Sequence, residues 1–192
     1  SSEKYAMKKK VLVIGSQGGI GKSVVNIFQR HDYQVITADI KDGGDYVVDA
    51  SSIDAMIQTL LKIESREDIP SHIISCLGVY FRKPAEDYSE EETDYIFRNN
   101  FYATTNVVTA LIKLKYIQGK NITLVSSLAG HFGGLDPFYA SAKAAVIAYA
   151  KSIAREYKTY HCKINVVAPG VVETPMATVM GEDRKAFYRD QI

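Results

Sequence analysis

Short apolar runs alternate along the chain with longer segments in which apolar residues recur at helical spacing. The runs that predict strands are, in chain order, Val11–Ile14, Gln34–Ala38, Tyr46–Val48, His72–Ser75, Ile122–Val125 and Lys163–Val167. Between them, helical patterns occupy residues 21–30, 53–64, 93–115 and 139–157. Strands that are apolar throughout are covered on both faces, which indicates a parallel sheet.

The alternation of strands and helices predicts an α/β fold, a doubly wound parallel sheet of the Rossmann type with right-handed crossovers. One connection departs from this pattern. Only residues 39–45 separate the second predicted strand from the third, whereas a parallel crossover usually takes about a dozen residues or more. We therefore expect an abbreviated crossover after the second strand.

Composition narrows the function classes. The chain has 192 residues and a formal net charge of +1, which predicts one domain and gives no electrostatic case for nucleic acid or an anionic membrane. The two cysteines, Cys76 and Cys162, lack metal-ligand spacing and predict no metal site and no disulfide framework. No apolar run approaches the roughly 20 residues of a membrane span. We expect a cytoplasmic protein.

A glycine-rich loop connects the first strand directly to the first helix. Its sequence is Gly15-Ser-Gln-Gly-Gly-Ile-Gly21. Glycines at this position allow a tight turn and let backbone N–H groups approach a pyrophosphate at the helix N-terminus. A merely flexible loop is the alternative, but the location between strand and helix favours dinucleotide binding.

Asp39 ends the second strand, where a carboxylate can accept hydrogen bonds from both ribose hydroxyls of an adenosine. The same charge repels a 2′-phosphate. No basic residue lies in the loop at 16–19, although Lys41 is near. The pattern favours NAD over NADP, and a solvated turn aspartate is the alternative.

Tyr139 and Lys143 are four residues apart at the start of a helical pattern, so their side chains share one face. A lysine cation favours the phenolate form and lowers a tyrosine pKa from its usual value of about 10. Such a tyrosine can pass a proton to or from a substrate oxygen. Ser127, which follows the fifth strand, carries a hydroxyl that can bond the same oxygen.

In this order, these motifs resemble the short-chain dehydrogenase/reductase family over about Lys10 to Met176. The resemblance implies a catalytic set of Asn100, Ser127, Tyr139 and Lys143. It also implies cofactor contacts from Gly15, Ser16, Gln17, Gly19, Ile20, Gly21, Asp39, Asp49, Ala50, Leu77, Gly78, Tyr139, Lys143, Pro169, Gly170, Val172 and Thr174. Residues 1–9 are then a polar lead or tag remnant, and residues 10–192 form a single NAD-binding catalytic domain.

The sequence departs from the family pattern in several places. Ile14 stands where a threonine is usual, and Ser75 and Cys76 replace two asparagines. The loop from Ser127 to Tyr139 is slightly shorter than is common. Family members also continue beyond the position of Ile192 with a substrate-covering helix, a further helix and a seventh strand. We therefore expect that a C-terminal part of the domain is missing here, through truncation or because a mobile tail is absent.

The resemblance implies an NAD-dependent oxidoreductase, with NADP as the less favoured cofactor, that interconverts a secondary alcohol and a ketone of small size. Apolar residues such as Tyr80, Phe132, Phe138 and Met176 are candidates for its substrate pocket. The pairing of long helices that is typical of the family implies a homodimer or homotetramer. Two alternatives are a non-catalytic NAD-sensing or scaffold protein and a dihydropteridine-reductase-like enzyme.

Overall fold

The computed structural model describes residues 8–171. They form a parallel sheet of six strands in the order β3-β2-β1-β4-β5-β6. The strands are β1 (Lys10–Ile14), β2 (Gln34–Asp39), β3 (Tyr46–Val47), β4 (His72–Ser75), β5 (Asn121–Val125) and β6 (Lys163–Val167). The strand order reverses next to β1, so the prediction of a doubly wound parallel sheet is confirmed.

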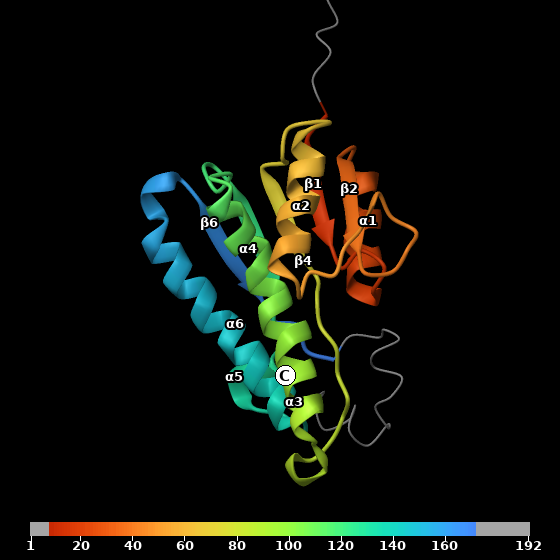
Figure 1. Cartoon of the computed structure of the whole chain (residues 1–192), viewed down its shortest axis with the longest axis vertical. Helices are drawn as coiled ribbons and strands as arrows, with labels where there is room; N and C mark the ends of the chain where they lie inside the picture. The colour runs from red at the N-terminus through yellow and green to blue at the C-terminus, as the bar shows by residue number, and fades with distance from the viewer. Residues whose placement is uncertain (1–7, 172–192) are drawn as a thin grey trace, which may run out of the picture.

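Helices cover both faces of this sheet (Figure 1). They are α1 (Gly19–Arg30), α2 (Ile53–Glu64), α3 (Glu90–Phe97), α4 (Ala103–Lys113), α5 (Ala129–Phe132) and α6 (Pro137–Glu156). With right-handed crossovers, α1 lies on one face, while α2, α4 and α6 lie side by side on the other. The core between the sheet and α2, α4 and α6 includes the fully buried side chains of Leu12, Ile73, Met56, Leu111 and Val146.

The connection between β2 and β3 contains no helix, as its length predicts. Asp45 folds the loop back onto the strand, because its carboxylate accepts hydrogen bonds from the backbone N–H (2.8 Å) and hydroxyl (2.9 Å) of Thr37. A polar groove of about 540 Å³ remains between this loop and α1. The abbreviated crossover thus leaves α1 without a neighbouring helix at this point.

The long helix predicted over residues 93–115 differs most from the structure. It begins earlier, because Ser89 and Glu92 form a reciprocal capping box ahead of α3. It is also interrupted, since residues Arg98–Tyr102 form a π-helical turn between α3 and α4. Single π-helical turns inside α-helices occur frequently at functional sites. The turn contains Asn100, so it falls on one of the predicted site residues.

Other element boundaries also differ from the prediction. The glycine-loop helix begins at Gly19 rather than Gly21, and α6 begins at Pro137 rather than Tyr139. Asp136 causes the second shift, because its side chain accepts from the backbone N–H of Tyr139 and caps the helix before a proline at its first position. No helix is predicted between Ile122–Val125 and residue 139, but Ala129–Phe132 form the single-turn helix α5.

Candidate active site

The glycine loop makes a close backbone contact with the end of β4. Gly15 has a positive φ of 81°, and a Cβ at this position would lie 2.5 Å from the carbonyl oxygen of Cys76. A Cβ on Gly21 would lie 1.9 Å from the carbonyl oxygen of Gly15. Both positions therefore require glycine. At the N-cap of α1, Gly18 offers no side chain to the first turn, so the backbone N–H groups there are open to an external acceptor.

Asp39 joins the glycine loop to the end of β2. Its buried carboxylate accepts from the backbone N–H of Gln17 at 2.8 Å and from that of Lys41 at 2.9 Å. Ser16 is held at the same place, where its backbone N–H donates to the carbonyl of Ala38. Ile20 and Gly19 follow in the first turn of α1. The loop and the acidic strand end thus form one connected unit.

Asp49 and Ala50, two further predicted cofactor-binding residues, follow β3, the strand next to β2. The backbone N–H of Val48 donates to the carbonyl of Asp39 at 2.8 Å, which places Asp49 beside the end of β2. The exposed Asp49 carboxylate accepts from the backbone N–H of Ser51, and the carbonyl of Ala50 accepts from the side chain of Asn106. Asp39 and Asp49 therefore lie at the carboxyl edge of adjacent strands.

Gly78 lies where Asn100 and Lys143 meet. A Cβ at Gly78 would lie 2.6 Å from the Oδ1 of Asn100 and 2.9 Å from the Nζ of Lys143. Asn100 is fully buried; its amide nitrogen donates to the carbonyl of Val79 at 2.9 Å, and its oxygen accepts from the N–H of Val79 at 3.2 Å. The structure therefore brings together the predicted residues Asn100, Gly78 and Lys143.

Lys143 is the most strongly perturbed cation among the described residues. Its side chain is 3% exposed, and its Nζ donates to the carbonyls of Leu77 at 2.9 Å and Val125 at 3.2 Å. Burial lowers its pKa from 10.5 to about 8. Burial also raises the pKa of the nearby Cys76 thiol to about 12, although the charge of Lys143 opposes that shift. Lys143 can thus exchange a proton near neutral pH, while Cys76 stays neutral.

Tyr139 lies one turn before Lys143 on α6, and the Nζ of Lys143 is 5.8 Å from the centre of the Tyr139 ring. The Tyr80 ring packs edge-on against the Tyr139 ring, with their centres 5.0 Å apart. The prediction that Tyr139 and Lys143 share one helix face agrees with this geometry.

Ser127 follows β5 and lies at the start of the segment that leads into α5. Its Oγ accepts from the backbone N–H of Ala129 at 3.2 Å. Gly130 lets α5 approach α6 closely, because a Cβ there would lie 2.8 Å from the carbonyl carbon of Lys143. The Ser127 segment therefore packs beside the part of α6 that carries the tyrosine and lysine.

The last group of predicted residues is described only in part. The carbonyl of Pro169 accepts from the backbone N–H of Leu128 at 2.9 Å, so Pro169 and Gly170 lie beside the Ser127 segment. Val172, Thr174 and Met176 lie outside the described residues. Of the apolar residues predicted to line a substrate pocket, Phe132 is 82% exposed, whereas Tyr80 lies against Tyr139.

Sequence reasoning missed Asp136, which is 2% exposed and accepts hydrogen bonds from three groups: the hydroxyl of Tyr88 and the backbone N–H groups of Arg82 and Tyr139. The signal was present in the sequence, since an aspartate followed by a proline is a typical helix start. The partners Arg82 and Tyr88 had no such signal, because they lie far from Asp136 along the chain.

The burial of Lys143 should make the free energy of unfolding depend on pH. Between about pH 8 and 9 the unfolded chain holds a proton on this lysine that the folded chain has released, so the free energy of unfolding should rise with pH. One such group contributes up to about 1.4 kcal/mol per pH unit. Urea unfolding in this range should show the rise in the wild type and a flatter profile in Lys143→Met.

The rise in the free energy of unfolding ends near pH 9, because the titration of Cys76 then has the opposite effect on stability. Its thiol loses a proton near pH 9 in the unfolded chain but keeps it to about 12 in the folded chain, so stability falls there as pH rises. Equal slopes for the wild type and Lys143→Met between pH 8 and 9 would contradict the assignment of the slope to Lys143.

No group of three His, Cys, Asp or Glu side chains within residues 8–171 is placed to hold a metal ion. None of the helices in the same range is both long and apolar enough to cross a bilayer.

A parallel sheet with reversed strand order, a glycine loop at its carboxyl edge and an acidic residue after β2 define a Rossmann-type dinucleotide-binding protein. The chain belongs to the short-chain dehydrogenase family, whose family model matches residues 9–185. The predicted family resemblance is confirmed. Members of this family are oxidoreductases that bind NAD(P) and act on alcohol or carbonyl groups.

Individual relatives are similar over most of the chain. Oxidoreductase UcpA of Salmonella typhimurium is 31% identical over 88% of this chain and 71% of its own length. The 3-oxoacyl-[acyl-carrier-protein] reductase FabG of Escherichia coli is 28% identical over 96% of this chain and 82% of its own. Among solved structures, a variant of ElxO with NADPH bound has a TM-score of 0.82 at 23% identity, covering 96% of this chain and 82% of that one. That structural likeness supports the fold.

Proposed function

We propose that this protein is an NAD(H)-dependent oxidoreductase that interconverts a secondary alcohol and a ketone, with Tyr139 as the general acid and base. The observation that carries the proposal is the placement of Lys143. A buried lysine with its pKa lowered to about 8 lies 5.8 Å from the Tyr139 ring and meets Asn100 at Gly78. Perturbed groups clustered in this way are typical of catalytic sites.

The residues at the carboxyl edge fit a bound dinucleotide. The uncapped first turn of α1 offers backbone N–H groups to the pyrophosphate, and a Cβ at Gly18 would meet only the carbonyl of Gly15, at 3.7 Å. The Asp39 carboxylate has further lone pairs for ribose hydroxyls beyond its two backbone partners. When bound, the nicotinamide supplies or accepts the hydride.

In carbonyl reduction, Tyr139 donates its hydroxyl proton to the substrate oxygen, and in alcohol oxidation it accepts the proton. Ser127 donates a second hydrogen bond to the same oxygen and orients it. Lys143 uses two of its three N–H donors on the carbonyls of Leu77 and Val125, which leaves one for a ribose hydroxyl. With a pKa of about 8, Lys143 also passes protons between Tyr139 and a water near Asn100.

The names of similar proteins suggest which carbonyl compounds to test first. FabG is named a 3-oxoacyl-[acyl-carrier-protein] reductase, and a relative from Acinetobacter, 26% identical over 92% of this chain, is named an acetoacetyl-CoA reductase. We infer a carbonyl compound as the substrate and take acetoacetyl-CoA and a hydrophobic cyclic ketone as probes. The aromatic ring of Tyr80 beside Tyr139 supports the cyclic ketone.

Fluorescence titration with NADH and, separately, NADPH tests the cofactor part of the proposal, and oxidation of either cofactor with the two carbonyl probes tests the reaction. We expect tighter binding of NADH and turnover of at least one probe. NADH binding with no turnover of any carbonyl or alcohol would favour a non-catalytic NAD sensor instead.

Asp39→Asn should shift cofactor preference toward NADPH. The change removes a charge that bonds ribose hydroxyls and repels a 2′-phosphate, and a hydrogen bond to a charged group contributes about 1.5–3 kcal/mol. We expect roughly tenfold or greater weakening of NADH binding by the same titration, with NADPH binding unchanged or improved.

Asp42→Asn is the matched control for Asp39→Asn. It removes the same charge from the same connection, but Asp42 is exposed and its side chain accepts from the adjacent N–H of Gly43. A similar loss of NADH affinity in both variants would mean that net charge, rather than the position of Asp39, governs cofactor binding.

A further inference from the structure

The segment between β4 and α3, residues 79–88, forms one wall of the proposed active site. At its start, the side chain of Asn100 pairs with both backbone groups of Val79. The next residue, Tyr80, packs its ring edge-on against that of Tyr139. Because Tyr139 is the proposed proton donor, the position of this segment determines the space beside the reacting oxygen.

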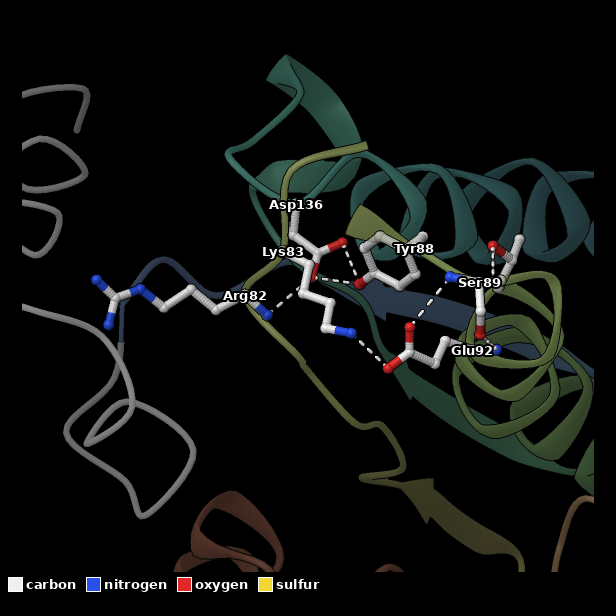
Figure 2. Close-up of polar contacts among 7 residues, drawn as sticks. Arg82, Lys83, Tyr88, Ser89, Glu92 and Asp136 are labelled. Carbon is white, nitrogen blue, oxygen red and sulfur yellow. Dashed lines mark hydrogen bonds and ion pairs between the residues drawn. The ribbon is translucent and has the colours of Figure 1, made fainter. Parts of the chain in front are cut away.

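The buried carboxylate of Asp136, the N-cap residue of α6, holds the rest of the segment (Figure 2). Both oxygens of Asp136 lie within hydrogen-bond distance of the Tyr88 hydroxyl, at 2.8 and 2.7 Å. The backbone N–H of Arg82 donates to Oδ2 of the same carboxylate at 3.0 Å. Burial and the bond to Asp136 together raise the pKa of Tyr88, so its hydroxyl keeps its proton and acts as a donor.

The same carboxylate also caps α6, the helix that carries Tyr139 and Lys143. Its Oδ1 accepts from the backbone N–H of Tyr139 at 3.1 Å. Asp136 therefore connects the wall segment directly to the backbone of the proposed catalytic residue. Arg82 has a left-handed φ of 61°, a conformation that costs a non-glycine residue energy, so the bond from its N–H to Asp136 holds a backbone that would otherwise relax.

A second anchor attaches the segment to α3. Lys83 forms an ion pair with Glu92, whose other carboxylate oxygen accepts from the backbone N–H of Ser89 in the capping box (Figure 2). Aromatic contacts fill the space between the anchors, since Tyr88 packs on Phe138 and Phe81 stacks on Tyr95. The Lys83 pair is partly exposed and contributes little by itself, so the buried Asp136 is the main attachment.

We propose that Tyr88 and Asp136 form a latch that holds residues 80–88 against the N-terminus of α6 and thereby positions the carbonyl substrate beside Tyr139. The inference rests on the proposed oxidoreductase function. Tyr88 and Asp136 are positioning residues in this account, because they reach the substrate through Tyr80 and the backbone of Tyr139. The latch sets the affinity for the carbonyl substrate and leaves the NADH site unaffected.

Tyr88→Phe tests the latch with the smallest change, because it removes one hydroxyl and keeps the ring packed on Phe138. We expect the KM for the carbonyl substrate to rise about tenfold, with NADH affinity unchanged. A merely structural role would lower the active fraction and leave both constants unaltered. Asp136→Asn keeps a side-chain oxygen to cap α6 and should raise the same KM.

The double variant distinguishes a shared hydrogen bond from two separate effects. If Tyr88 and Asp136 act through one contact, the combined Tyr88→Phe/Asp136→Asn change should raise KM no more than the worse single variant. If the KM increases of the two single variants multiply in the double variant, the latch proposal is wrong. Tyr95→Phe is the matched control, because Tyr95 belongs to the same aromatic cluster but is 47% exposed, and we expect its KM to match the wild type.

Hydrogen exchange supplies a readout that does not depend on turnover. Amides in residues 80–88 should exchange faster in Tyr88→Phe than in wild type or Tyr95→Phe, since the bond that protects the Arg82 N–H loses its support. Unchanged exchange together with unchanged KM overturns the latch. If the wild type turns over no carbonyl compound, the proposed function fails, and the positioning role fails with it whatever the exchange shows.

Discussion

Tyr139→Phe lowers carbonyl reduction by about 10²- to 10⁴-fold and leaves NADH binding unchanged, because the change removes one oxygen atom that donates the proton. The ring remains against Tyr80, and α6 keeps its Asp136 cap, so the site retains its shape. Turnover is measured by the oxidation of NADH with the better of the two carbonyl probes, and cofactor binding by fluorescence titration.

Tyr160→Phe is the control for this variant. Tyr160 lies in the short helical turn Lys158–Tyr160, away from α6's first turns, and its side chain is substantially exposed. We expect wild-type turnover from it. If Tyr139→Phe retains the turnover of this control, another group protonates the substrate and the proposed mechanism is wrong.

Lys143→Met should have the second-largest effect, with turnover lowered by about 10²-fold or more. The folded protein loses the lysine proton near pH 8, so above that value Lys143 cannot resupply Tyr139. Wild-type carbonyl reduction should therefore fall as pH rises through about 8, by up to tenfold per unit, while alcohol oxidation rises. The residual activity of Lys143→Met should lack this break.

Lys151→Met provides the comparison on the same helix, since Lys151 lies two turns further along α6 and is exposed. Its pH profile should match that of the wild type. A break near pH 8 that persists in Lys143→Met would assign the titration to another group and contradict the proton transfer through Lys143.

Most of the fold could be predicted because a covered parallel sheet leaves a strong apolar pattern. In β1, Val11–Ile14 are all apolar and buried after the single polar residue Lys10, and the short connection at 39–45 excludes a crossover helix. The π-helical turn at Arg98–Tyr102 could not be predicted, since a single extra residue in a helix is stabilised by tertiary contacts. Here those contacts are the bonds from Asn100 to Val79.

In the candidate site, too, features set by local spacing could be predicted and contacts between distant elements could not. Glycine positions, Asp39 and the Tyr139–Lys143 pair follow from local spacing, which a sequence records directly. The burial of Lys143, its bonds to Leu77 and Val125, and the contact at Gly78 depend on four elements meeting: the end of β4, β5, α6 and the π-helical turn. The same limit applies to Asp136 and Tyr88, which are distant in sequence and adjacent in the structure.

In the proposed reaction, bound NADH would supply a hydride to the carbonyl carbon while Tyr139 donates the proton to the carbonyl oxygen. Both transfers can be followed with NADH that carries deuterium at both C4 positions, incubated with the protein and acetoacetyl-CoA or the cyclic ketone. We expect an alcohol product with deuterium on the former carbonyl carbon from the wild type, and at least a hundredfold less of this product from Tyr139→Phe. A product without deuterium, or equal labelling by both proteins, would contradict the proposed reaction.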